Sequence, residues 1–249
     1  MIVDVKKLLD AGVHFGHLTR KRHPNMSPYI FMEKDGTHIL DLNQTVNKLN
    51  ESLQALKKIT KTGRRILFVA TKKQAKGIVA ETAAALNMPF ITERWPGGLL
   101  TNFATIRKSI KKMQTIDKMK ENGTFDSLSK RERLQIDRQR AKLDLNLGSI
   151  VKMTRMPEAV FIVDAGKENI ALAEANKLGI RSFAMNDTNT NPNLVSFPIP
   201  SNDDASKSIQ CILSIVKAAI AEGLEERGAD QEAKAVEKKE KAKKITEDK

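Results

Sequence analysis

Two uninterrupted apolar segments, residues 66–70 and 159–163, constrain the fold of this chain more than any other feature. Each is followed by an amphipathic helical pattern and then by a second strand-like segment, at 90–92 and 181–185. Strands of a parallel sheet are covered by helices on both faces, so they contain continuous rather than alternating apolar residues. The sequence therefore predicts an α/β domain with a parallel sheet flanked by helices.

The segment between these two units has a different pattern. Residues 101–121 and 129–150 each carry a narrow apolar seam, with charged residues around the rest of the helix. Such seams are typical of two helices that pack mainly on each other. We expect residues 101–150 to form a protruding antiparallel helical hairpin, a short coiled coil. It would be inserted into an α/β domain made of residues 1–100 and 151–222.

The C-terminal segment, residues 223–249, contains charges of alternating sign, no aromatic residue and few apolar residues. A segment of this composition cannot bury enough apolar surface to offset the entropy lost on ordering. We expect a charged, disordered tail that carries no site.

Cysteine content and hydropathy point to one cellular compartment. The single cysteine, Cys211, excludes an intrachain disulfide and suits a reducing environment. The longest apolar runs are far shorter than the roughly 20 residues that a membrane-spanning helix needs. An acidic residue precedes the first lysines, so no targeting segment is visible. We expect a cytoplasmic protein with no membrane partner.

Basic residues are concentrated in the first three fifths of the chain. Residues 1–149 contain 28 Lys and Arg against 14 Asp and Glu, and residues 52–80 contain eight bases and no acid. Each cation that binds a phosphate releases condensed counterions. A stretch without compensating acids therefore favours a polyanionic partner over a surface that is charged only for solubility.

Basic side chains next to planar ones are the candidate RNA contacts. They are Arg20, Lys21 and Arg22, the pair Arg94 and Trp95, and the helical set Arg107, Lys108 and Lys111. Cationic groups suit phosphates, and rings can stack on a base or sugar. Because only 4% of the residues are aromatic, recognition of folded RNA by shape is favoured. Trp95 is equally well explained as a residue of the core or of a domain seam.

A metal site is an alternative interpretation of several polar residues. His14 and His17 could share an ion, but zinc requires three or four ligands. The carboxyl edge of the sheet could add Asp187, Asp203 or Asp204 to His17, which would suit zinc or magnesium. Loop hydrogen bonds and helix caps explain the same residues more simply. We therefore expect no cofactor.

An enzyme is the rival interpretation. Its site would be the crevice beside Asp187 and Thr188, where open α/β sheets bind nucleotides or phosphates. The chain lacks a glycine-rich phosphate loop, and this crevice has no nearby nucleophile and base. Fold class alone favours this alternative, so we expect no catalytic residues.

Twelve short motifs occur in one order across residues 4–222. They lie at 11–17, 28–31, 38–42, 67–69, 71–75, 94–95, 97–98, 100–103, 123–125, 187–189, 198–200 and 202–205. This series resembles the bacterial small-subunit ribosomal protein S-two family. One departure is Thr190-Asn191, where Cys or Ser followed by Asp is common, and this change removes possible metal ligands.

The resemblance implies a fold, a function and partners. It implies a flavodoxin-like (Rossmann-like) α/β domain with a protruding helical pair, and a structural role in the small ribosomal subunit. Members contact small-subunit ribosomal RNA and other small-subunit proteins, and help to anchor ribosomal protein S-one in support of translation. By position, Lys72 and Lys73 would join the basic residues near RNA.

Overall fold

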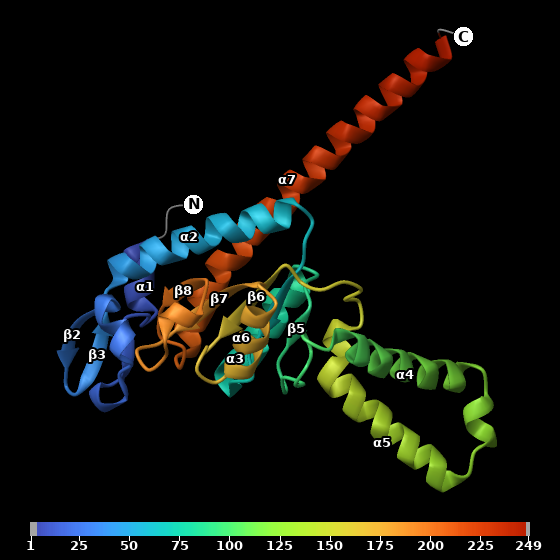
Figure 1. The fold of residues 1–249 in the computed structure, drawn as a ribbon, viewed down its shortest axis with the longest axis horizontal. Coiled ribbons are helices and arrows are strands. Elements are labelled where there is room, and N and C mark those ends of the chain that lie inside the picture. Colours follow the sequence, from blue (N-terminus) through green and yellow to red (C-terminus); the bar gives the residue numbers. More distant parts are fainter. Residues whose placement is uncertain (1–3, 248–249) are drawn as a thin grey trace.

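The computed structural model describes residues 4–247, with side chains described as far as residue 230 (Figure 1). Its centre is a five-stranded sheet in the order β5-β4-β6-β7-β8, and all neighbouring strands are parallel. The strands are β4 Ile66–Val69, β5 Phe90–Ile91, β6 Ala159–Val163, β7 Arg181–Asn186 and β8 Phe197–Pro200. This order is that of the flavodoxin type of doubly wound sheet. The predicted parallel sheet is confirmed.

Helices cover both faces of this sheet. One face carries α2 (Leu42–Lys61), α3 (Lys73–Ala85) and the first part of α7 (Ser206–Glu247). The other face carries α6 (Asn169–Lys177) and the segment that leads from β5 into the helical pair. Because β4 and β6 are buried on both faces, every residue in them is apolar, as the continuous runs predicted.

A second, smaller sheet precedes α2 and was not anticipated. After α1 (Val5–Asp10), strands β1 (Phe15–Leu18), β2 (Ile30–Lys34) and β3 (Thr37–Leu40) form an antiparallel sheet in the order β1-β3-β2. The turn between β2 and β3 contains Asp35 and Gly36, with φ of 51° and 72°. Two consecutive positive φ angles are typical of the tight turn of a hairpin.

Helices α4 (Phe103–Glu121) and α5 (Lys130–Leu147) contact each other and extend away from the sheet in Figure 1. The short turn η3 (Thr124–Ser127) joins them. Arg140 Nε lies 2.9 Å from Asp117 Oδ1, and Lys120 Nζ lies 2.6 Å from Asp137 Oδ1, so ion pairs connect the two helices. A capping box between Ser129 and Glu132 fixes the start of α5.

The packed part of the chain reaches Asp230, beyond the residue 222 expected from composition. Helix α7 continues without a break, and Lys57 Nζ on α2 lies 2.7 Å from Glu226 on α7. Lys61 Nζ lies 3.7 Å from Asp230. Charges at four-residue spacing on both helices therefore hold the segment that composition assigned to a tail. Residues 231–249 are the rest of the segment predicted to be disordered, and their side chains lie outside those that the structure describes.

No helix in the described part of the chain combines the length and the apolarity that crossing a bilayer requires.

Candidate nucleic-acid interface

The exposed cations closest to the N-terminus lie in one turn. Arg20 and Lys21 belong to η1 (Thr19–Lys21), which follows β1, and Arg22 comes directly after it. All three are exposed, and none forms an ion pair among the residues with described side chains. The backbone N–H of His23 donates to Thr188 O at 2.8 Å, which fixes this turn at the carboxyl edge of the main sheet. The three cations are thus available to a phosphate.

Lys72 and Lys73 lie in different environments. Lys72 Nζ lies 2.6 Å from Asp204, 2.7 Å from Asp203 and 3.2 Å from Asp164, and its side chain is 13% exposed. An ammonium has three N–H donors, so these carboxylates saturate it. These ion pairs engage Lys72 within the protein, and its contact with RNA stays a prediction. Lys73 begins α3 and is exposed.

Lys72 belongs to a polar cluster at the carboxyl edge of the sheet. His17 comes from β1, Asp187 follows β7, and Asp203 and Asp204 precede α7. One donor atom from each of these four residues lies within 4.8 Å of the others. His17 Nδ1 is 2.8 Å from Asp187, and His17 Nε2 is 3.5 Å from Asp204. The four possible metal ligands named from the sequence therefore come together.

Burial and neighbouring charges shift the pKa values of three side chains in this cluster. Burial, together with the neighbouring Asp164 and Asp187, raises the pKa of Asp203 to about 7 against the opposing effect of Lys72. Burial opposes the charge of Lys72, but hydrogen bonds and the negative charges of the carboxylates raise its pKa. The hydrogen bond to Asp187 raises the pKa of His17 despite partial burial. Each cation of the cluster is therefore stabilised in its charged form.

The donor set fits a divalent ion. One imidazole nitrogen and three carboxylates suit zinc, and the carboxylates suit magnesium. Asp203 Oδ2 is buried and has no hydrogen-bond partner among the described residues. His14 is outside this set, and its ring lies against Phe15 at 4.1 Å between centroids. Thr190 donates to Asp187 O at 3.0 Å, so its hydroxyl serves the turn.

Trp95 is a buried seam residue, with 7% of its surface exposed. Its indole Nε1 donates to Glu174 Oε1 on α6 at 3.0 Å. Trp95 thus lies in a seam of the core, one of the two interpretations left open by the sequence, and only a small part of its ring is exposed. Glu174 was missed by sequence reasoning. The signal that could have revealed it is an acid on the buried face of α6, next to Ala171 and Ala175.

The remaining predicted contacts surround the base of the helical pair. Arg94 is exposed in the loop after β5, and Lys108 and Lys111 are exposed on α4. Arg107 is half-buried and donates from Nη1 to Thr154 O at 2.5 Å, so part of its guanidinium holds the chain after α5. Arg94, Lys108 and Lys111 form no ion pair with any residue whose side chain is described, so they are available to phosphates.

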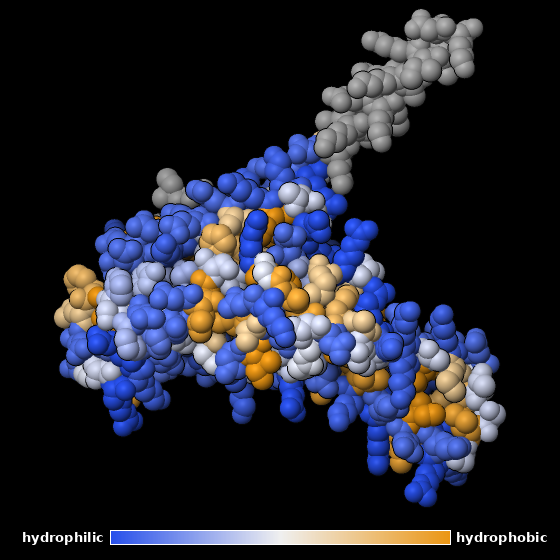
Figure 2. Space-filling model, in the orientation of Figure 1, coloured by the Kyte–Doolittle hydropathy of each residue, from blue (hydrophilic) through white to orange (hydrophobic). Residues whose placement is uncertain are grey.

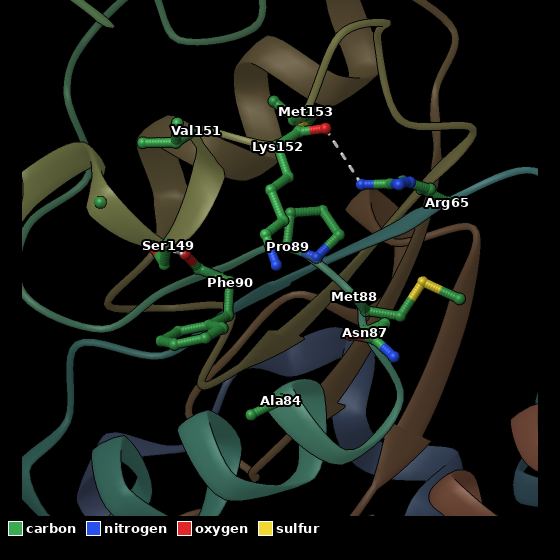
Figure 3. Close-up of a pocket in the computed structure, with 11 residues that line it drawn as sticks. Arg65, Ala84, Asn87, Met88, Pro89, Phe90, Ser149, Val151, Lys152 and Met153 are labelled. Atoms are coloured by element: carbon green, nitrogen blue, oxygen red, sulfur yellow. Dashed lines mark hydrogen bonds between the residues drawn. The ribbon is translucent and has the colours of Figure 1, made fainter. Parts of the chain in front are cut away.

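A cavity of about 470 Å³ lies near the start of β4 and β5 (Figure 3). Two exposed cations, Arg65 and Lys152, belong to its lining, and Arg65 Nη1 donates to Lys152 O at 3.1 Å. In Figure 3 the Lys152 side chain extends toward Pro89 and Phe90. Sequence reasoning did not identify this basic hollow, because its residues come from distant parts of the chain.

Comparison with known proteins decides the family. The family model for ribosomal protein S2 matches residues 8–223. The chain belongs to the ribosomal protein S2 family. Proteins described as "Small ribosomal subunit protein uS2" are similar over nearly the whole chain. The one from Flavobacterium johnsoniae is 63% identical over 235 residues, covering 94% of this chain and 92% of that protein.

Other relatives agree. The protein of the same description from Flavobacterium psychrophilum is 64% identical, over 93% of this chain and 87% of its own length. The one from Parabacteroides distasonis is 56% identical over 99% and 94%. The S2 family is structural and non-enzymatic. The resemblance in the motifs is thus confirmed, as are the expected structural role in the small ribosomal subunit and the absence of enzymatic activity.

Proposed function

We propose that this S2-family chain binds and orders folded ribosomal RNA of the small subunit in the cytoplasm, through cations on several surfaces. The observation that carries the proposal is the set of exposed cations that stand outside the ion pairs of the described residues. This set includes the predicted contacts Arg20, Lys21, Arg22, Lys73, Arg94, Lys108 and Lys111. In Figure 2 hydrophilic residues cover most of the visible face, with apolar patches between them. Cations of this kind contact phosphates without reading sequence.

The helical pair extends this cationic surface. Residues 103–147 contain 12 Lys and Arg against 6 Asp and Glu. We propose that residues 101–150 act as a projecting antiparallel coiled coil that reaches RNA beyond the α/β domain. Two of its acids pair with cations of the partner helix, Asp117 with Arg140 and Asp137 with Lys120, and Glu132 caps the start of α5. The outward cations, such as Lys108 and Lys111, are left for phosphate.

Protein partners form the second part of the proposal. We propose contacts to other small-subunit proteins, including the anchoring of ribosomal protein S-one, as the family resemblance implies. Exposed apolar side chains on the small sheet support a protein contact, since Phe31 on β2 is 71% exposed and Met32 is 47% exposed. Exposed apolar side chains that form a contiguous patch are typical of protein contact sites.

Salt-dependent binding tests the RNA proposal. Filter binding of the purified chain to small-subunit ribosomal RNA should weaken steeply with salt, because bound cations release counterions. Replacing Arg20, Lys21 and Arg22 together by Ala should lower the slope of log affinity against log salt by about 1 for each phosphate that the variant no longer neutralises. Lys217→Ala, an exposed cation on α7, is the matched control. An unchanged slope in the triple variant would remove this turn from the interface.

A further inference from the structure

A cavity of about 480 Å³ lies where the base of the helical pair meets the loop after β5. Arg94 and Trp95 line it from the loop, Ser109 from α4, and Gln139, Lys142 and Leu143 from α5. This volume lies within the roughly 300–1,000 Å³ of small-molecule sites. The cavity can therefore hold one nucleotide-sized group and is too small for a folded segment.

The lining combines an apolar wall with a cationic rim. Trp95 and Leu143 contribute carbon surface, while Arg94 and Lys142 contribute two positive charges. No acid belongs to this lining, and neither cation forms an ion pair within the described residues 4–230. The amide of Gln139 adds one acceptor and two donors. An apolar planar group attached to an anion fits this chemistry.

Trp95 is held in a fixed orientation. Glu174 accepts its indole N–H, and the same carboxylate accepts the backbone N–H groups of Gly98 and Leu100. Because the only polar atom of the indole is engaged in the interior, Trp95 offers only ring carbons to the cavity. Contact with ring carbons is tolerant of base identity, since every base has an apolar face.

We propose that this cavity receives one unstacked nucleotide of the bound RNA. The base lies against Trp95 and Leu143, and its phosphate lies between Arg94 and Lys142. The inference rests on the proposed RNA-binding function and specifies its ligand. Bases inside a duplex are stacked and paired, so the nucleotide comes from a loop, a bulge or a single strand.

Trp95 is the only tryptophan of the chain, so its fluorescence reports on this cavity alone. The full chain is titrated with single-stranded hexa-adenylate and, separately, with a 12-base-pair RNA duplex. Binding of each RNA is followed by the anisotropy of a label on the RNA. Hexa-adenylate is expected to change Trp95 emission saturably. The duplex is expected to bind through surface cations and to leave the emission unchanged.

Two variants localise the effect. Ser109→Phe adds bulk to the cavity without changing charge and should weaken hexa-adenylate binding about tenfold, with duplex binding unchanged. The double variant Arg94→Ala with Lys142→Ala should also weaken the binding of hexa-adenylate about tenfold. Lys118→Ala with Lys130→Ala removes two exposed charges from the same helices, outside the cavity lining, and should affect both RNAs equally. Should Ser109→Phe fail to fold by circular dichroism, Asn146→Phe replaces it, since Asn146 also lines the cavity and Phe adds bulk there.

The outcomes separate the two proposals. Hexa-adenylate could bind without changing Trp95 emission and bind the Ser109→Phe variant as tightly as the wild type. This result would overturn the nucleotide site but not the proposed RNA binding. Equal changes of emission with duplex and single strand would also overturn it. Absence of binding by either RNA at low salt would refute both the site and the proposed function.

Discussion

The indole Nε1 of Trp95 donates to Glu174 Oε1 at 3.0 Å, and the same oxygen accepts the backbone N–H of Gly98 at 2.7 Å. The second oxygen accepts the N–H groups of Leu100 and Thr101 at 3.0 and 3.1 Å. One carboxylate on α6 therefore fixes the whole segment that leads into the helical pair. Buried charged acceptors of this kind form strong hydrogen bonds.

Glu174→Gln is expected to lower the free energy of unfolding by about 2–3 kcal/mol, because an amide turns donor hydrogens toward N–H groups that need an acceptor. Urea denaturation followed by circular dichroism measures it. Glu81→Gln, an exposed acid on α3, is the matched control and should change stability by less than about 0.5 kcal/mol. Equal stability of both variants would show that the hydrogen bonds of Glu174 contribute nothing.

The same carboxylate makes the free energy of unfolding depend on pH in the acid range. Burial alone would raise the pKa of Glu174, but hydrogen bonds from Trp95 and from three backbone N–H groups hold it below its ordinary 4.5. Because the pKa of Glu174 is lower in the folded state, its ionised form stabilises the fold. This contribution is complete at pH values above the unfolded-state pKa and is lost as the pH falls through the folded-state pKa. The difference in unfolding free energy between wild type and Glu174→Gln should therefore be constant at neutral pH. It should shrink below about pH 4. A difference that grows with acidity would contradict this.

Lys72 and Lys73 should behave differently when each is replaced by Met. Lys72→Met leaves Asp164, Asp203 and Asp204 without their shared cation, so the free energy of unfolding should fall by about 2 kcal/mol or more. Lys73→Met removes an exposed charge and should be nearly neutral for stability while weakening RNA binding. Thermal unfolding and filter binding compare the two. The reverse pattern would mean that Lys72 faces the solvent and Lys73 the interior.

Zinc should compete with Lys72 for the cluster of His17, Asp187, Asp203 and Asp204. Because Lys72→Met removes the competing cation, it should bind zinc about tenfold more tightly than the wild type and regain stability when zinc is added. Isothermal titration of the chelator-treated chain measures the affinity. Lys73→Met serves as the control. Identical affinities in wild type and Lys72→Met would argue that zinc binds elsewhere.

Two glycines of α7 provide a matched pair. A Cβ at Gly223 would lie 2.8 Å from Lys57 O, a backbone atom of α2, whereas a Cβ at Gly228 would meet nothing within 4 Å among the residues with described side chains. Gly223→Ala should destabilise the chain by about 1–3 kcal/mol, because α2 and α7 must separate. Gly228→Ala should stabilise it by up to about 1 kcal/mol through helix propensity. Chemical denaturation distinguishes them, and stabilisation by both substitutions would show that α7 is not packed closely at Gly223.

The main sheet could be predicted because parallel strands leave a local signature, the continuous apolar runs at 66–70 and 159–163. The small sheet could not, since β2 is half-buried at Ile30 and exposed from Phe31 to Lys34, so it shows no alternation. Its best local signal is the Asp35-Gly36 pair, which suits a hairpin turn.

The site was predictable only in part. The topology explains why His17, Asp187, Asp203 and Asp204 come together, because strand ends share one edge of a parallel sheet. Neighbouring identical residues such as Lys72 and Lys73 give no local signal of which one turns inward. The role of Glu174 depends on N–H groups more than 70 positions away in the chain, which no local pattern reveals.

The ammonium of Lys72 is a counter-ion that the chain carries with it. A free ion leaves its carboxylates whenever its concentration drops, but a tethered one stays at the same effective concentration under all growth conditions. The closure of β4, β6 and α7 around these acids is therefore independent of metal supply.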